Sequence, residues 1–294
     1  DGNLLRRFKN CKVLGVTPEK IGYLAIKNGI PTIIDYFNKK VVSKIKKKYG
    51  KPKIVTATNV FAHIDNLDEL LKNILKLIGT DGIFVSESHY FLSLVKTLQY
   101  DTIYHEHLRY YTVRSLKNIF KKYGMKIIKV KKINTHGGSI RVYATKNKKY
   151  SVDKTVNKAL IEEKKFLSEK NIKLFCNKVF ESKINLLNIL RKIRNKNNNI
   201  YAVGAPSRAT TLVNYVGITK DIVDCICEVK GSHKINHYLP GTRIPIVSEE
   251  KIFKKKPKYL LLLSWHISKE LIRNLKKKGY KGKFIIPLPS PKVI

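Results

Sequence analysis

The sequence has few acidic residues, no long apolar run and no recognisable signal peptide. Asp and Glu number 21 against 60 Lys and Arg, so the 294-residue chain has a formal net charge of +39. The richest apolar run, residues 259–265, is strand-sized and far shorter than the roughly 20 residues that cross a bilayer. The N-terminus shows no charged segment followed by an apolar one. We therefore expect a cytoplasmic protein without a membrane partner.

Cysteine is also scarce, and its spacing predicts neither disulfides nor zinc. The four cysteines lie at positions 11, 176, 225 and 227, without a CxxC pair and without a His/Cys pair at metal-ligand spacing. A reducing compartment fits this pattern. The prediction for the site therefore includes no metal.

The excess of lysine does not by itself indicate a nucleic-acid partner. Lysines occur in every segment, with runs at residues 46–48, 146–149 and 254–256. A face that binds DNA or RNA would concentrate charge on one element and interleave aromatic side chains, and no RNP, KH or helix-turn-helix signature is present. A compositional bias toward Lys, Asn and Ile accounts for such a pattern as easily as selection for nucleic acid does, and we expect at most nonspecific nucleic-acid binding.

The N-terminal half alternates strand and helix patterns. We expect strands at residues 13–16, 32–34, 54–60 and 83–86, and helices at residues 18–28, 41–48 and 67–78. Asp65 is the expected N-cap of the third helix, and Gly79 its end. This alternation predicts a parallel sheet with helices on both faces. A helix at 115–122 and two strands at 125–132 and 139–145 follow, an ending typical of Rossmann-like methyltransferases rather than dehydrogenases.

The second half begins with a long lysine-rich helical segment and then resumes the α/β pattern. Expected strands lie at residues 199–203, 222–227, 243–247, 259–263 and 283–287, with a helix at 210–215. With 43% hydrophobic residues, the chain can bury a substantial core, and its length suggests about two domains. We predict an α/β protein with a Rossmann-like methyltransferase domain (1–148), a helical linker (149–198) and a second Rossmann-like α/β domain (199–294).

Residues 100–111 form the densest cluster of reactive side chains. The sequence YDTIYHEHLRYY holds two His, two acids and four Tyr, beyond a predicted strand, where α/β sheets bind ligands. Histidine can take a proton, a carboxylate can orient it, and tyrosines can donate to an oxyanion. The pattern alone leaves two alternatives open: a metal site of His105 and His107 with Glu106 or His63, or a polar structural turn.

Two further places could bind a ligand. His63 follows a predicted strand, where a lone histidine is more often structural than catalytic. Residues 204–208 (GAPSR) form a strand-to-helix turn whose backbone N–H groups could meet a phosphate, with Arg208 in support. A tight connection between strand and helix is the alternative reading of this turn.

Taken together, the motifs resemble one family, the S-adenosylmethionine-dependent sugar C-methyltransferases. The resemblance runs nearly end to end. It is carried, in order, by NVFAHI (59–64), YDTIYHEH (100–107), THGGSIRVY (135–143), GAPSRATTLVNYVGI (204–218), LPGTRIPI (239–246), LLLSWHI (261–267) and FIIPLP (284–289).

The resemblance implies a substrate, a cofactor and roles for particular residues. The acceptor would be a nucleotide-linked 4-keto-deoxysugar, commonly methylated at C3 through an enolate, and the cofactor S-adenosylmethionine. His107 would be the general base, Glu106 and Tyr104 would orient it or bind the sugar, and His63 would stabilise the enolate oxygen. The cofactor residues would be Asp1, Gly2, Thr17, Asn59 and Phe61, and the substrate residues His105, Asn59, Ser207 and Arg208.

The chain departs from the family pattern at its N-terminal end. The zinc-binding module of the family is missing, the first strand of the sheet would precede Asp1, and only Asp1-Gly2-Asn3 would remain of the cofactor loop. Thr17 replaces the acidic residue expected after the second strand, with Glu19 two positions on. An alternative function is therefore a non-catalytic, decayed methyltransferase that binds ligands, nucleic acid among them. A dehydrogenase is disfavoured because no GxGxxG joins a strand to a helix.

Overall fold

The computed structural model covers residues 1–294 and describes all of them except the side chain of His136. The strands are β1 (Gly15–Thr17), β2 (Thr32–Ile34), β3 (Ile54–Thr58), β4 (Ile83–His89), β5 (Lys126–Ile133), β6 (Ser139–Thr145), β7 (Ile200–Val203), β8 (Cys225–Glu228), β9 (Ile246–Ser248), β10 (Tyr259–Leu262), β11 (Lys283–Ile286) and β12 (Lys292–Val293). The α-helices are α1 (Ile21–Lys27), α2 (Lys39–Tyr49), α3 (Leu67–Ile78), α4 (Phe91–Lys96), α5 (Val113–Lys122), α6 (Lys154–Phe166), α7 (Glu169–Arg194), α8 (Ser207–Val216), α9 (Glu250–Lys255) and α10 (Ser268–Lys277). Short 3₁₀ helices are η1 (Leu5–Arg7), η2 (Phe61–His63), η3 (Tyr100–Thr102), η4 (Thr135–Gly137) and η5 (Trp265–Ile267).

The chain divides into two compact units, which we describe separately. The N-terminal unit consists of Asp1–Ser88, Val113–Lys131 and Arg141–Lys158. The C-terminal unit consists of His89–Thr112, Lys132–Ile140 and Ala159–Ile294. This division differs from the domain boundaries predicted from the sequence, because the segment that contains η3 groups with the C-terminal sheet.

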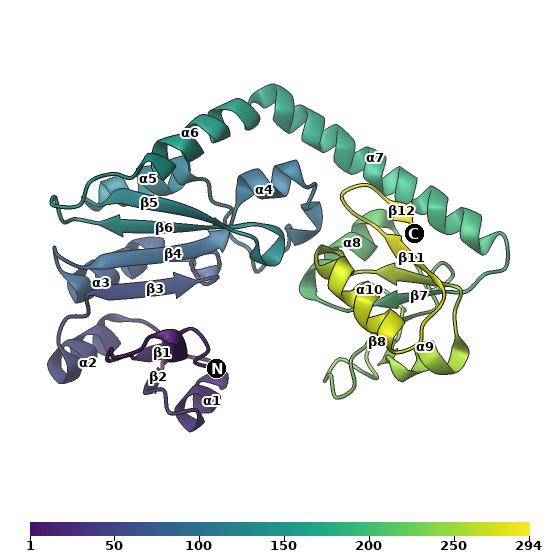
Figure 1. Cartoon of the computed structure of the whole chain (residues 1–294), viewed down its shortest axis with the longest axis horizontal. Helices are drawn as coiled ribbons and strands as arrows, with labels where there is room; N and C mark the ends of the chain where they lie inside the picture. The colour runs from purple at the N-terminus through teal and green to yellow at the C-terminus, as the bar shows by residue number, and fades with distance from the viewer. The chain divides into compact units, whose positions relative to one another are not determined.

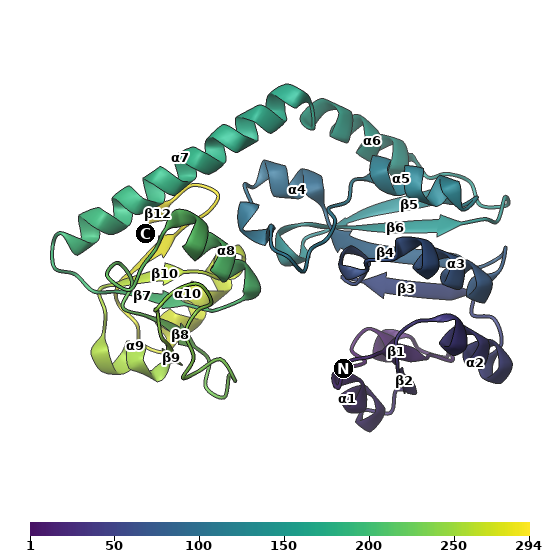
Figure 2. The same ribbon diagram turned by 180° about the vertical axis from the view of Figure 1, so that it is seen from behind.

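The N-terminal unit contains two sheets. Strands β1 and β2 form a parallel pair, and the four-stranded sheet has the order β3-β4-β6-β5, with β3 parallel to β4. Figures 1 and 2 show the pair beside the β3 edge of the larger sheet. One apolar cluster joins them: Val41, Val42 and Ile45 of α2, Leu77 of α3, and Val16, Ile33 and Val55 of β1, β2 and β3.

Helix α3 covers the four-stranded sheet, and its ends follow from local chemistry. The side chain of Asn66 accepts a hydrogen bond from the backbone N–H of Glu69 (3.0 Å), so Asn66 is the N-cap and not Asp65 as predicted. Gly79 ends the helix at φ +68°, a left-handed conformation that glycine adopts without strain. Four apolar side chains on one face of the helix are buried: Leu71, Ile74, Leu77 and Ile78.

Three phenylalanines hold η2 against this sheet. The ring centroids of Phe61 and Phe84 lie 5.9 Å apart, those of Phe61 and Phe120 6.2 Å, and those of Phe84 and Phe120 5.9 Å. All three side chains are fully buried. Packing of this kind, worth about 0.5–1.5 kcal/mol per pair beyond area burial, fixes the turn that follows β3.

The C-terminal unit contains the second Rossmann-like sheet. Its order is β12-β11-β10-β7-β8-β9, with β7 to β11 parallel and β12 antiparallel. The chain enters at β7, builds outward through β8 and β9, and returns to the other side of β7 with β10. This is the strand order of dinucleotide-binding Rossmann sheets, and it places a topological switch point between β7 and β10.

Alternate residues of these strands supply two separate cores. Ile200 and Ala202 of β7 pack in a cluster with residues of α7 and α8. Tyr201 and Val203 pack in the opposite cluster with Ile252 of α9 and residues of α10. Because neighbouring side chains of a strand point to opposite faces, the sheet is covered on both sides. The predicted α/β class with two Rossmann-like sheets is confirmed.

Helix α7 is the longest helix of the chain's described part, and it belongs to the C-terminal unit. It begins after Ser168, whose hydroxyl accepts from the N–H of Asn171 (3.4 Å), and it buries Leu186, Leu190 and Ile193 near its C-terminal end. Its mixture of buried apolar and exposed charged residues is that of a helix at a protein surface. Among the helices described, none is long and apolar enough to pass through a membrane.

Candidate active site

The segment 100–111 lies in the C-terminal unit and begins with η3. The side chains of Tyr104 and His107 are half-buried, whereas those of His105 and Glu106 are exposed. The backbone N–H of His107 donates to the carbonyl oxygen of Tyr104 (3.0 Å), a turn that brings the two rings together. Their ring centroids lie 4.3 Å apart at an interplanar angle of 32°.

Hydrogen bonds define which nitrogen of His107 carries a proton. Nδ1 of His107 lies 2.9 Å from the carbonyl oxygen of Thr102, which can only accept. Nδ1 therefore carries a proton, and in the neutral ring Nε2 is the unprotonated nitrogen, which can accept a hydrogen bond. The hydroxyl of Tyr104 donates to Nε2 over 3.2 Å. The arrangement gives His107 one nitrogen that can take a proton from a ligand.

The two tyrosines beside His107 stay protonated over the physiological range. Burial, followed by the nearby charge of Glu106, raises the pKa of Tyr104 above its ordinary value. Burial also raises the pKa of Tyr110 to about 12, and the Tyr110 hydroxyl donates to the carbonyl oxygen of Thr102 (2.9 Å). Both hydroxyls are thus hydrogen-bond donors. That of Tyr110 is used by the Thr102 carbonyl, so Tyr104 is the donor that an oxyanion could engage.

Arg208 lies at the start of α8 and is already engaged inside the protein. Its Nε and Nη2 donate to the two carboxylate oxygens of Asp101, each over 2.7 Å, and the arginine is 7% exposed. The predicted phosphate contact would require this fork to leave a buried carboxylate, at the cost of an unpaired internal charge. Ser207, one residue earlier, is exposed at the first turn of the helix.

The turn after β7 contains polar groups that sequence reasoning missed. The N–H of Ala205 donates to the carboxylate of Glu228, the last residue of β8. Lys234 donates from Nζ to the carbonyl oxygen of Ala205 (2.7 Å). Gly204 has φ +86°, and a Cβ atom there would lie 2.4 Å from Oγ of Ser264, so only glycine fits this approach of two loops. Glu228 could have been found from the sequence, because it is an acidic residue at the end of the second strand of this sheet, where Rossmann proteins bind a ribose hydroxyl.

In the N-terminal unit, Asn59 and His63 lie on the turn that follows β3. Asn59 has φ +53°, and its N–H donates to the carbonyl oxygen of Glu87 (2.8 Å). The side chains of Asn59 and His63 are exposed. Phe61 lies between them in the sequence, but its side chain is fully buried. A cofactor contact at position 61 would therefore come from the backbone.

Gly2 lies close to α1, and Thr17 is the last residue of β1. Gly2 has φ +76°, and a Cβ atom there would come within 2.9 Å of Cγ1 of Ile30. The hydroxyl of Thr17 accepts from the N–H of Glu19 (3.2 Å), and the Thr17 carbonyl accepts from the N–H of Asp35 (3.0 Å). Asp35 follows β2 and is an acidic residue at this edge that sequence reasoning missed. Asp1 is exposed.

Among the side chains that the structure describes, no three His, Cys, Asp or Glu residues come together as metal ligands would. The four cysteines are free thiols, two exposed (Cys11 and Cys176) and two buried in β8 (Cys225 and Cys227).

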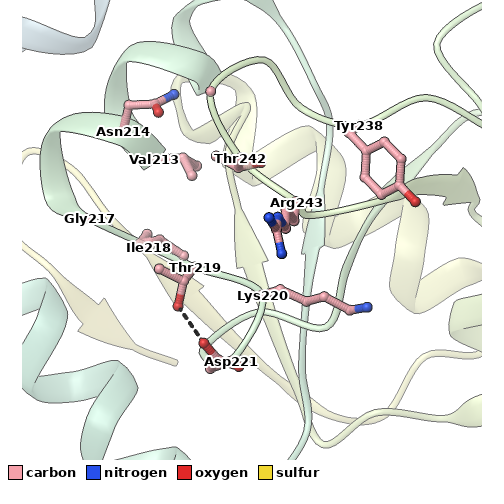
Figure 3. Close-up of a pocket in the computed structure, with 11 residues that line it drawn as sticks. Val213, Asn214, Gly217, Ile218, Thr219, Lys220, Asp221, Tyr238, Thr242 and Arg243 are labelled. Atoms are coloured by element: carbon pink, nitrogen blue, oxygen red, sulfur yellow. Dashed lines mark hydrogen bonds between the residues drawn. The ribbon is translucent and has the colours of Figure 1, made fainter.

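A cavity of about 1160 Å³ lies elsewhere in the C-terminal unit. Figure 3 shows it between the end of α8, at Val213 to Gly217, and the loop that includes Tyr238 and Arg243. These residues precede β8 and β9, so the cavity lies at the amino ends of the strands. Ligands of Rossmann sheets bind at the carboxyl ends, and the residues that line this cavity include none of the predicted site residues.

Comparisons with known proteins agree with both halves of the chain. Residues 2–130 match the family described as methyltransferase domain, and residues 134–289 match the family described as C-methyltransferase C-terminal domain. The C-methyltransferase NovU of Streptomyces niveus is 31% identical over 295 residues, which cover 99% of this chain and 70% of that protein. The chain therefore belongs to the C-methyltransferase family.

Proposed function

We propose that the protein transfers the methyl group of S-adenosylmethionine to the carbon next to the ketone of a nucleotide-linked 4-keto-deoxysugar, with C3 as the expected position. The observation that carries this proposal is the fixed neutral tautomer of His107, with Nε2 available as a base. Membership of the C-methyltransferase family supports the reaction class. The cytoplasm stays the predicted location.

The proposed role of His107 is to remove a proton. Nε2 takes the proton next to the ketone, and the electron pair of the broken C–H bond passes to the enolate, whose carbon becomes the nucleophile. S-Adenosylmethionine, when bound, supplies an electrophilic methyl group. A proton next to a ketone is weakly acidic, so the base works only if donors stabilise the enolate oxygen at the same time. Once Nε2 holds the proton it no longer accepts from Tyr104, so the Tyr104 hydroxyl can turn to the enolate oxygen; Tyr104 and His63 are the proposed donors, while Glu106 and His105 would contact the sugar.

The N-terminal unit would hold the cofactor. Strand β1 ends at Thr17 and β3 at Thr58, directly before Asn59, and the carboxyl edge of such a sheet is where ligands bind. Gly2, whose position admits no side chain, leaves its backbone open to close approach. Asp35, whose backbone N–H donates to the carbonyl oxygen of Thr17, is an acidic residue at the same edge. These residues fit a ligand with hydroxyl groups, and we propose that Asp1 and the backbone of Phe61 complete the set.

The C-terminal unit would hold the nucleotide of the substrate. The turn after β7 presents Ser207, while Glu228 and Lys234 contact Ala205 on the β8 side. A carboxylate at the end of the second strand suits a sugar hydroxyl, and a lysine suits a phosphate. Since Arg208 is paired with Asp101, we propose Lys234 as the cation that meets the diphosphate.

Replacement of His107 tests the proposal. The variant His107→Asn should lower kcat for methyl transfer by about 10²- to 10⁴-fold, the usual contribution of a positioned base, and should leave the affinity for S-adenosylhomocysteine unchanged. The matched control is His237→Asn, an exposed histidine on another loop. Methyl transfer that survives in His107→Asn at the wild-type rate would refute the role of this histidine.

A further inference from the structure

The most deeply buried charge of the C-terminal unit lies directly before the residue that orients His107. Asp101 is 0% exposed and accepts three N–H donors, Nε and Nη2 of Arg208 and Nε1 of Trp265, each over 2.7 Å. The guanidinium carbon of Arg208 lies 4.8 Å from the centroid of the Trp265 ring. A carboxylate without water is tolerated only when it is paired and hydrogen-bonded in this way.

These three residues come from distant parts of the chain and meet at one place in the Rossmann sheet. Arg208 belongs to the loop and helix after β7, and Trp265 to η5 after β10. The loops after β7 and β10 border the topological switch point, where Rossmann sheets bind their ligands. In this protein the chain's own η3 places Asp101 between them. Leu98 and Tyr100, which precede Asp101, join the same apolar cluster as α7 and α8, and this anchors the start of η3.

A single backbone carbonyl connects this anchor to the histidine. The carbonyl oxygen of Thr102, the residue after Asp101, accepts from Nδ1 of His107 (2.9 Å), from the hydroxyl of Tyr110 (2.9 Å) and from the N–H of Tyr104 (3.2 Å). The direction of this carbonyl decides whether Nδ1 or Nε2 of His107 carries the proton. If the Thr102 carbonyl turned away, Nδ1 would lose its acceptor, and the neutral ring could carry its proton on Nε2 instead.

We propose that Asp101, Arg208 and Trp265 form a positioning network that holds the Thr102 carbonyl so that His107 has its proton on Nδ1 and leaves Nε2 unprotonated, as a base requires. The inference rests on the proposed function for the meaning of the base, but the tautomer it predicts does not depend on activity. The three residues are positioning residues, since they act through Thr102 and not on the substrate. Arg208 thereby has a role different from the phosphate contact that its place on α8 suggests.

Three variants weaken the network in graded ways. Trp265→Phe removes one N–H donor and retains an aromatic ring beside Arg208. Arg208→Lys retains the charge but loses the planar fork that binds both carboxylate oxygens. Asp101→Asn removes the charge. The control is Asp224→Asn, which weakens another ion pair of the same unit, in which Nη1 of Arg194 lies 3.2 Å from Oδ2 of Asp224.

Nitrogen-15 spectra of the histidine side chains provide the test. In the wild-type protein and in Asp224→Asn, His107 should carry its proton on Nδ1, and in Trp265→Phe and Arg208→Lys a part of the population should carry it on Nε2. The same variants should lower kcat by about tenfold to a hundredfold, the cost of a small misplacement of a reacting group, with little change in the KM for S-adenosylmethionine.

An unchanged tautomer and an unchanged kcat in both folded variants would overturn the network. Trp265→Phe serves as the decisive variant if Asp101→Asn does not fold, because it leaves the ion pair in place. If the wild-type protein shows no methyl transfer but the variants still change the tautomer of His107, the network is supported and the proposed function is refuted. The two claims therefore fail separately.

Discussion

The hydrogen bonds of single residues determine what the 100–111 segment can do. Thr102 offers one carbonyl to three donors, and as a result His107 has a defined tautomer and Tyr110 a fixed ring. Tyr104 contributes its hydroxyl to the opposite side of the imidazole. An imidazole whose Nε2 carries no proton can accept one from a ligand.

Alkaline titration tests the environment of Tyr110. Burial raises the pKa of Tyr110 to about 12, above the value of about 10 in an unfolded chain. The folded state therefore binds the proton more tightly, so this stabilisation is complete below about pH 10 and is lost as the pH rises toward 12. Ultraviolet titration curves would be recorded for the wild-type protein and for Tyr110→Phe. The difference between the two curves should show one phenol that ionises near pH 12. A difference centred near pH 10 would contradict the burial described for this ring.

The sequence predicted the residues that lie close together in the chain, and it missed their distant partners. His107 and Tyr104 are three positions apart, so their cluster was visible as a motif. Asp101 and Trp265 are 164 positions apart, and no local pattern indicates that the two meet. The motif also indicated Phe61 as a cofactor residue, but not that its ring packs in the core.

Helices and strands were predicted well where periodicity and end signals agree. The bounds of α3, β2 and β6 match the expected ranges, because each has an apolar pattern closed by polar or glycine residues. Two candidate caps, Asp65 and Asn66, stand side by side before α3, and local sequence does not distinguish between them. Strand β8 begins three residues later than expected because Ile222 and Val223 belong to the turn that precedes it.

One charged residue joins three elements of the C-terminal unit and offers a test at this scale. Glu162 of α6 forms ion pairs with Lys132 of β5 and with Lys96 of α4, the second at 2.7 Å. Hydrogen bonds from Lys132, then Lys96, hold the pKa of Glu162 below its ordinary value. A lowered folded pKa means that the stabilisation is present above the unfolded value, and is lost as the pH falls through the folded one.

Replacement of this glutamate should therefore have an effect that depends on pH. Glu162→Gln should lower the free energy of unfolding by up to about 1 kcal/mol near pH 7, and the difference from wild type should disappear in acid. Urea unfolding at the two pH values measures both. Glu169→Gln, which removes an exposed pair with Lys173 on α7, should change little. If both variants lost the same free energy of unfolding, the ion pairs of Glu162 between α4, β5 and α6 would stabilise the protein no more than an ordinary exposed pair does.

At the scale of the whole molecule, the segment that contains His107 belongs with the C-terminal sheet. It follows β4 in the chain, so alternation of strands and helices assigned it to the first domain. Leu98, Tyr100 and Asp101 are instead buried among residues of the C-terminal unit. We infer that the unit proposed to bind the nucleotide also holds the base, while the N-terminal unit has the proposed cofactor residues.

Hydrogen exchange at the substrate carbon is the most direct test of this account. A nucleotide-linked 4-keto-deoxysugar would be incubated in heavy water with the protein and S-adenosylhomocysteine, which has no methyl group to transfer. The account predicts that deuterium enters next to the ketone, and that His107→Asn abolishes this exchange while retaining the fold. A wild-type protein that binds the sugar without exchange, or an equal exchange rate in His107→Asn, would contradict it.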